Sequence, residues 1–225
     1  MTIKVLVILP CCKNKTGEEL YFESEIRFED FLRPEFVHRL DEARKRFRSY
    51  IDLNSTPMSA LGKYNGFLYR CTQDFKQQIK NSVENGEVDV LIMSAVYGFL
   101  HPSQYIFTYE KEMDNKTANL WINLGLPEIL EEYIRQVKIN KVFGFFARSS
   151  GYFKVVCAVN WNKMKDCSIL EEVKIYYPIF GAAGAQRVVP QILGKLVLTL
   201  KQFGFDSNVF QGKPFHFNGY LIDYL

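Results

Sequence analysis

The chain has 225 residues, of which 48% are hydrophobic and 15% aromatic, so it can bury one large core and is not intrinsically disordered. Its 28 lysines and arginines against 25 aspartates and glutamates give a net charge of +3, which excludes a strongly basic protein but is compatible with a local basic face. We expect a single compact domain over residues 1–225.

No apolar stretch reaches the roughly 18 to 20 residues that cross a membrane. The first nine residues lack the basic region and the cleavage site of a signal peptide. The sequence therefore predicts a cytoplasmic protein without a membrane partner. Its five cysteines, two of them adjacent, form neither a disulfide framework nor a zinc pattern, so we expect reduced thiols, no metal site and no cofactor.

Three apolar runs predict strands, over residues 4–9, 88–94 and 141–147. Their nearly continuous valine, isoleucine, leucine and phenylalanine content is typical of strands that are covered on both faces, as in a parallel sheet. Between these runs, apolar side chains recur every three or four residues, which is the spacing of one helix face. This spacing predicts helices over residues 34–50, 72–83 and 126–137.

A fourth strand, residues 174–180, precedes a long helix over residues 184–203, which Pro190 either kinks or restarts. The segment 181–187 (GAAGAQR) lacks the GxGxxG spacing of a dinucleotide loop, and we interpret it as a close-packing approach to that helix. Residues 204–225 are expected to pack without regular structure. The alternation of strands and helices predicts an α/β fold, a single domain with a central, mainly parallel sheet flanked by helices.

Ligands of parallel sheets bind at the carboxyl ends of the strands, where the loops into the following helices converge. Three polar loops occupy this position in the predicted fold: residues 10–15 (PCCKNK), 94–102 (SAVYGFLHP) and 148–152 (RSSGY). Each loop presents charged, hydroxyl or aromatic groups at a strand end. We therefore expect the three loops to form one site.

The first loop carries two lysines around an amide. If the loop is extended, the ammonium groups of Lys13 and Lys15 project to the same side and Asn14 points away. Such an arrangement suits phosphate. A solvated basic turn, which is what short lysine-rich loops usually are, is the alternative interpretation. The adjacent thiols of Cys11 and Cys12 diverge on an extended segment, so they can neither chelate one metal nor form an unstrained disulfide, and we expect one of them to be buried.

The second loop combines a hydroxyl, a phenol and an imidazole, from Ser94, Tyr97 and His101. A phenol can stack on a nucleobase, and an imidazole can donate to a developing anion or take up a proton near neutral pH. A glycine-centred turn with an aromatic anchor is the alternative interpretation of these residues.

Three carboxylates, Glu110, Glu112 and Asp114, alternate further along the chain and share one face if the segment is extended. One of them could orient a water or stabilise positive charge. A charged surface is the alternative.

The third loop opens a predicted helix. Ser149 and Ser150 can cap its free N–H groups, and such a helix start also suits phosphate, with Arg148 and Lys154 adding positive charge. Capping alone would also explain the serines. Arg187, at the start of the last predicted helix, is a further candidate for a phosphate contact.

The order of these motifs resembles a known family. Residues 94–102, followed by Tyr109 and Glu112-Met113, resemble the SGLYGLLRP…Y..EM segment of the YaaA peroxide-stress family. Residues 147–156 (ARSSGYFKVV) are similar to the later ASxxYxKVV segment of that family. Residues 10–15 are closer to the PCSxxK loop of YaaA-like proteins and of the archaeosine synthase core domain, whereas YaaA itself reads SPAK there. The resemblance extends over about residues 5–200.

This resemblance implies a YaaA-like α/β domain associated with nucleic acid. YaaA family members are described as DNA-binding and protective in oxidative stress, and archaeosine synthase modifies a base in tRNA. Our leading hypothesis is an enzyme acting on DNA or RNA that contains a modified base, specifically a DNA N-glycosylase, which is a hydrolase. Chemistry on a base requires base flipping, in which the nucleotide leaves the duplex and enters a pocket.

In this hypothesis Tyr97 stacks on the base and Asn14 reads its edge. Asp114 or Glu110 positions a water or stabilises the cationic sugar, by analogy with glycoside hydrolysis, and His101 stabilises the departing base. Phosphates contact the remaining candidates, which are Lys13, Lys15, Ser94, Arg148, Ser149, Ser150, Lys154 and Arg187.

Two other functions remain open at this point. One is a non-catalytic DNA-binding stress protein, in which the basic loops contact only the backbone, and the other is an enzyme of free nucleotides. If the leading hypothesis holds, Asn14, Tyr97 and Arg148 line one cavity.

Overall fold

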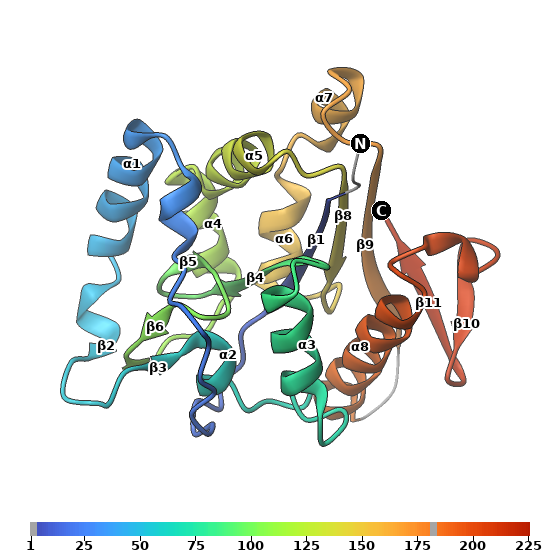
Figure 1. Ribbon diagram of the computed structural model, residues 1–225, viewed down its shortest axis with the longest axis horizontal. Coiled ribbons are helices and arrows are strands. Elements are labelled where there is room, and N and C mark those ends of the chain that lie inside the picture. The colour runs from blue at the N-terminus through green and yellow to red at the C-terminus, as the bar shows by residue number, and fades with distance from the viewer. Residues whose placement is uncertain (1–3, 181–183) are drawn as a thin grey trace.

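A seven-stranded sheet in the order β10-β11-β9-β8-β1-β4-β5 forms the centre of the computed structural model, which describes residues 4–180 and 184–225 (Figure 1). The four inner strands β9, β8, β1 and β4 are parallel, whereas β5, β11 and β10 are antiparallel to their neighbours. The predicted α/β fold with a mainly parallel central sheet is therefore confirmed. The strands are β1 Val5–Pro10, β4 Asp89–Ser94, β5 Gly98–Leu100, β8 Lys141–Phe145, β9 Glu172–Ile179, β10 Phe215–Phe217 and β11 Tyr220–Tyr224.

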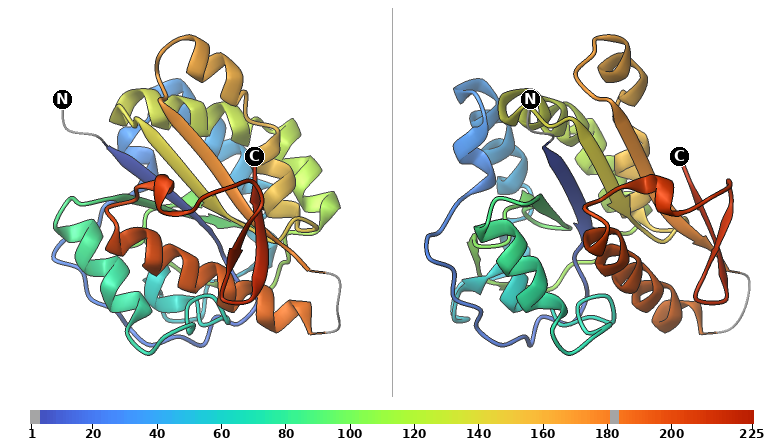
Figure 2. Two further views of the ribbon diagram at one scale, coloured as in Figure 1. Left: turned by 90° about the vertical axis from the view of Figure 1, so that its right-hand side faces the viewer. Right: turned by 45° about the vertical axis from the view of Figure 1, so that its right-hand side comes forward.

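Helices cover both faces of the sheet: α3 and α8 lie on one face, and α4, α5 and α6 lie on the other (Figures 1 and 2). The helices are α1 Pro34–Lys45, α2 Ala60–Lys63, α3 Phe75–Glu84, α4 Asn115–Asn123, α5 Leu126–Val137, α6 Gly151–Cys157, α7 Trp161–Asp166 and α8 Ala185–Gln202. Short 3-10 turns occupy Phe28–Phe31, Arg48–Tyr50 and Ser207–Val209. Two small antiparallel pairs are β2 Ile51–Asp52 with β7 Thr108–Tyr109, and β3 Met58–Ser59 with β6 Tyr105–Ile106.

The core explains the apolar runs of the sequence. In β1, Leu6, Val7, Ile8 and Leu9 are all completely buried, because helices cover the sheet from both sides. On the sheet face that α4 covers, the indole ring of Trp121 stacks on Phe47 with ring centroids 4.7 Å apart. Burial on both faces removes any alternation of apolar and polar residues, and this is the pattern from which the parallel strands were predicted.

One predicted helix is longer than the observed one, and the long last helix is confirmed without the restart at Pro190. The helix predicted over residues 34–50 ends at Lys45, and the chain turns so that the buried Phe47 can reach Trp121. The last helix, α8, continues through Pro190 without a break. Proline has no N–H, so residue 190 cannot donate to the carbonyl of Gln186 as a helical residue would. Part of the small-residue segment 181–187 lies outside the described residues.

The prediction of an irregular tail is wrong, because β10 and β11 form a hairpin that pairs with β9. Asn218 and Gly219 make the turn with φ of 49° and 79°, the left-handed backbone that a two-residue hairpin loop requires. Phe215 and Ile222 face each other across the hairpin, and both are buried. The Asn-Gly pair is a hairpin signal that was present in the sequence.

None of the helices in residues 4–180 and 184–225 is both long and apolar enough to cross a membrane.

Candidate functional site

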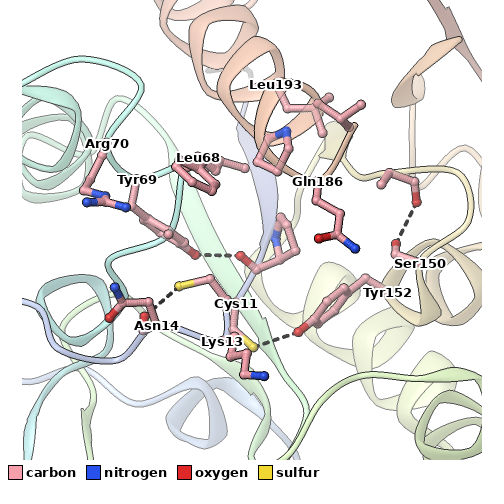
Figure 3. Close-up of a pocket in the computed structure, with 17 residues that line it drawn as sticks. Cys11, Lys13, Asn14, Leu68, Tyr69, Arg70, Ser150, Tyr152, Gln186 and Leu193 are labelled. Carbon is pink, nitrogen blue, oxygen red and sulfur yellow. Dashed lines mark hydrogen bonds between the residues drawn. The ribbon is translucent and has the colours of Figure 1, made fainter. Parts of the chain in front are cut away.

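A cavity of about 500 Å³ lies at the carboxyl ends of β1 and β8 (Figure 3). The connection from β1 to β4 ends in α3 on one face of the sheet, whereas α6 follows β8 on the other face (Figure 1). Ligands of open α/β sheets bind at such a point, where neighbouring connections diverge. The cavity is lined by four segments of the chain, at Pro10–Asn14, Gly66–Arg70, Ala147–Tyr152 and Gln186–Leu193.

The first wall is the loop after β1. The side-chain oxygen of Asn14 accepts hydrogen bonds from the backbone N–H and the hydroxyl of Thr16, at 3.0 and 2.6 Å. Its side-chain NH₂ group is thereby left for a ligand. The thiol of Cys12 donates to the backbone carbonyl of Asn14 (2.9 Å), and burial raises the pKa of this thiol to about 12. Cys12 is therefore a packed thiol in the wall.

The second wall comes from residues 66–70, which contact the first loop directly. A Cβ on Gly66 would lie 2.5 Å from Cβ of Cys12, so only glycine permits this approach. The hydroxyl of Tyr69 donates to the carbonyl of Pro10 at 2.8 Å. These contacts fix the position of the exposed Phe67 at the cavity.

Two guanidinium groups lie close to the ring of Phe67. Arg70 is 5.4 Å and Arg187 is 5.5 Å from the centroid of its ring, which are cation–π distances. Both arginines are exposed. An aromatic face with two cations beside it can bind a planar, anionic ligand.

The third wall is the start of α6. Ser150 caps this helix, because its hydroxyl accepts from the N–H of Phe153 at 3.2 Å and donates to the carbonyl of Ala147 at 2.7 Å. Tyr152 follows, and its ring stacks on Phe146 with centroids 6.5 Å apart. Its hydroxyl lies 2.9 Å from Sγ of Cys11 (Figure 3). Burial and the neighbouring thiol raise the pKa of Tyr152 well above its ordinary value.

The predicted single site from three loops is wrong, because the loop of residues 94–102 does not reach the cavity. Asn14 lines the 500 Å³ cavity, Arg148 lines a neighbouring cavity of about 570 Å³, and Tyr97 lines neither of them. The reason is Gly98, whose φ of 72° turns the chain back so that β5 runs antiparallel to β4. The loop therefore leaves the carboxyl edge of the sheet.

Tyr97 is an internal anchor. Its ring meets Tyr109 edge-on at 5.6 Å, and burial raises the pKa of its hydroxyl to about 12. Ser94 is completely buried, and its hydroxyl accepts from the backbone N–H groups of Val96 and Tyr97. Neither the predicted base stacking by Tyr97 nor the predicted phosphate contact of Ser94 is possible in this arrangement.

His101 lies at the opposite end of the sheet. It borders a separate hollow of about 310 Å³ together with Lys4 and Asp89, which are at the amino ends of β1 and β4. A ligand at Asn14 cannot reach it, so its predicted role on a departing base is wrong.

The two lysines of the first loop border one small hollow but differ in exposure and in their partners. Lys13 is exposed and forms an ion pair with Glu112 at 3.3 Å. Lys15 is buried, its ammonium group donates to the carbonyl of Lys13 at 3.1 Å, and it lies 4.1 Å from the ring centroid of Tyr109. Both lysines border a small hollow of about 270 Å³ that also contains Glu110.

The carboxylate of Asp114 has a structural role at the start of α4. Its carboxylate caps α4 by accepting from the N–H of Thr117 at 2.7 Å, and these hydrogen bonds lower the pKa of the carboxyl. Helix capping accounts for this carboxylate.

The other cationic candidates surround the carboxyl edge. Arg148 lies 5.3 Å from the ring centroid of Tyr177 and lines the 570 Å³ cavity together with Ser149. This cavity adjoins the first, since both are bordered by Ala147, Gln186, Val189 and Pro190. Lys154 is exposed on α6.

The sequence analysis missed Phe67, Arg70, Tyr152 and Gln186 as cavity residues. Phe67 and Arg70 belong to a segment without apolar periodicity, and only the tertiary contact between Gly66 and Cys12 brings it to the first loop. Among the described residues, no three histidine, cysteine, aspartate or glutamate side chains gather where they could hold a metal ion.

Comparisons with protein-family models and with curated proteins found no match to this chain. The YaaA-like resemblance therefore stays a hypothesis.

The buried His101 gives the protein a predictable pH dependence. Burial lowers the pKa of its imidazole from 6.5 to about 4, so the unfolded chain takes up a proton at a higher pH than the native protein. The contribution of the neutral His101 to the free energy of unfolding is therefore fully present above pH 6.5. It is lost as the pH drops toward 4, and the loss amounts to about 3 kcal/mol. Urea unfolding across this range is expected to show the loss.

His101→Asn is the matching variant, because its amide oxygen can replace Nδ1, which lies 2.8 Å from the hydroxyl of Ser103. We expect the variant to lose less stability than the wild type between pH 6.5 and 4. Equal losses in the two proteins would exclude His101 as the titrating group.

Proposed function

We propose that this protein binds a nucleotide of DNA or RNA in the 500 Å³ cavity and acts on its base, as an N-glycosylase that excises a modified base. The observation that carries the proposal is the composition of the cavity. Its lining is mainly apolar and includes the Phe67 ring, with a few amides, hydroxyls and cations, and within the described part of the chain it contains no carboxylate. Such a lining suits a flat, polar and anionic ligand.

The cavity also has the required size and place. Its volume lies within the roughly 300 to 1,000 Å³ of ordinary ligand pockets. Asn14 and Gln186 belong to different walls of the cavity, and their amides are the candidates to read the edge of a base. A base that stacks on Phe67 would place its phosphates near Arg70 and Arg187, at the exposed rim.

The catalytic carboxylate would be Glu110 in this proposal. Lys13 lines both the cavity and the small hollow that contains Glu110, so the sugar of a base held in the cavity would extend toward this carboxylate. Glu110 is exposed and can position a water or stabilise a cationic sugar. Asp114 is the weaker candidate because it caps α4.

A second candidate is a non-catalytic DNA-binding protein of the YaaA type. One observation favours it: among the described residues, the carboxylates lie outside the 500 Å³ cavity. In this case the same lining would only hold the nucleotide.

A measurement of base release distinguishes the proposed N-glycosylase from the proposed DNA-binding protein. Purified protein would be incubated with DNA oligonucleotides carrying natural, damaged or enlarged bases, and with tRNA. Abasic sites in DNA would be detected by alkaline strand cleavage, and bases released from tRNA would be detected by chromatography. We expect Glu110→Gln to lower the release rate by about 100-fold or more, as the loss of a general acid–base group does.

Glu112→Gln is the matched control, since this neighbouring exposed carboxylate pairs with Lys13 and lies in the same hollow. It is expected to retain most of the rate. If wild-type protein releases no base from any substrate while binding them, the enzyme proposal is wrong and the binding protein is favoured.

A further inference from the structure

A chain of hydroxyl and thiol groups leads from the buried end of β4 to the cavity. It begins at Ser94, whose oxygen accepts from the N–H groups of Val96 and Tyr97 at 3.2 and 3.1 Å. Both of its acceptor positions are then occupied, so the hydroxyl must donate. It donates to the hydroxyl of Tyr109 at 3.0 Å.

The hydroxyl of Tyr109 is the next group in this chain of hydrogen bonds, and its neighbours decide to which atom it donates its proton. The hydroxyl of Tyr64 lies 2.9 Å from that of Tyr109, and Sγ of Cys11 lies 3.1 Å from it. A phenol has a single proton to donate. The arrangement that gives every group a partner has Tyr64 donating to Tyr109 and Tyr109 donating to Cys11.

The thiol of Cys11 continues this chain of hydrogen bonds. Cys11 is buried, and within the described residues its sulfur contacts two hydroxyls, those of Tyr109 and Tyr152. Either atom of the Cys11–Tyr152 contact can be the donor, and the arrangement that gives the buried S–H proton a partner directs it to the oxygen of Tyr152, 2.9 Å away. The O–H of Tyr152 is then left without a protein acceptor in the described structure, and Tyr152 lines the cavity.

We propose that Tyr152 is the specificity-determining hydrogen-bond donor of this cavity. Its O–H would donate to a carbonyl oxygen of the bound base, and a base that presents an N–H or a C–H at that place would be rejected. The inference rests on the proposed function, because it names the base class that the same cavity takes. Successive donors polarise one another, so the chain from Ser94 strengthens the final donor.

The donor direction can be tested without any ligand. In a protein whose other four cysteines are replaced by alanine, the S–H stretching band of Cys11 would be recorded by Raman spectroscopy. We expect the low frequency of a donating thiol. Tyr152→Phe should raise it to that of a free thiol, whereas Tyr109→Phe, which removes only a donor to the sulfur, should leave the S–H group bonded.

The opposite pattern, in which Tyr109→Phe frees the S–H group and Tyr152→Phe does not, would overturn the inference. A missing S–H band at neutral pH would do the same, because a thiolate accepts from both tyrosines and leaves Tyr152 no proton for a ligand.

The specificity is tested with pairs of single-stranded oligonucleotides that differ by one carbonyl. One pair carries inosine or nebularine, the purine without the carbonyl, and the other carries uridine or its analogue without the 4-carbonyl. For at least one pair we expect wild-type protein to bind the carbonyl member about five- to tenfold more tightly, as one buried hydrogen bond allows.

Tyr152→Phe should reduce this ratio to about one, while Cys11→Ser, whose hydroxyl can both accept and donate, should retain it. Equal binding of both members of each pair by wild-type protein would overturn the inference and leave the proposed function intact. If wild-type protein binds none of the four oligonucleotides, the proposed function fails and so does the ligand assigned to Tyr152, and the Raman measurement still decides the donor direction.

Discussion

Arg44→Leu is expected to lower the free energy of unfolding by about 2 to 3 kcal/mol at neutral pH, because the buried carboxylate of Glu29 loses its buried cationic partner and keeps only the more exposed Arg27. Glu29 is buried and accepts from Arg44 at 3.0 Å and from Gln104 at 3.2 Å. Arg44 also donates to the carbonyl of Tyr97 at 2.9 Å. Urea unfolding of the variant measures the loss.

The pH dependence of this loss identifies its cause. Burial raises the pKa of Glu29, but the charge and hydrogen bonds of Arg44 outweigh it and lower the pKa from 4.5 to about 2. The stabilisation is therefore present above pH 4.5 and is lost as the pH falls toward 2. The difference between wild type and Arg44→Leu should narrow over this range.

Lys45→Leu is the control on the same helix, since Lys45 pairs with Glu42 at the exposed surface. We expect it to change stability little, as exposed ion pairs contribute little. If the loss in Arg44→Leu were the same at acidic and neutral pH, the buried pair would not be its cause.

Reversing both charges beside Phe67 should reduce the affinity for single-stranded nucleic acid by about 100-fold or more at low salt, because phosphate neutralisation supplies most of such binding. The variant is Arg70→Glu with Arg187→Glu, which changes the two exposed guanidinium groups at the cavity. Titration by fluorescence anisotropy at several salt concentrations measures it. The slope of log affinity against log salt should fall by about 1.4, or 0.7 for each lost phosphate contact.

Two further variants show whether the position or only the net charge matters. Lys163→Glu with Lys165→Glu makes the same change of charge on α7, away from the cavity (Figure 1), and is expected to keep most of the affinity. Phe67→Ala should weaken binding by about 1 to 3 kcal/mol through lost stacking, with the salt slope unchanged. Equal losses from both charge reversals would contradict a binding site at Phe67.

The sequence predicted the sheet well because burial on both faces leaves a local signature. Val7 and Ile8 in β1 and Val90 and Leu91 in β4 are completely buried, so their strands consist of apolar runs. The hairpin of β10 and β11 also had a local signal in Asn218-Gly219, but its short aromatic strands did not form a long apolar run.

The site was less predictable because its walls meet only in the folded chain. Asn14 and Ser150 lie in the loops that follow β1 and β8, so their place at the carboxyl edge could be predicted. Phe67 and Gln186 come from a segment without periodicity and from the first turn of α8, and no local pattern relates either to β1. Tyr97 was placed at the site because one glycine turn, at Gly98, was interpreted as part of a ligand loop.

The two outermost strands of the sheet, β5 and β10, are each only three residues long. A strand edge carries unpaired N–H and C=O groups that another chain can use as a template, and short outer strands limit how many such groups are available. The buried Gly98–Leu100 strand is also covered by its surroundings. The short outer strands therefore leave few unpaired backbone groups at the two ends of the sheet with which another chain could pair.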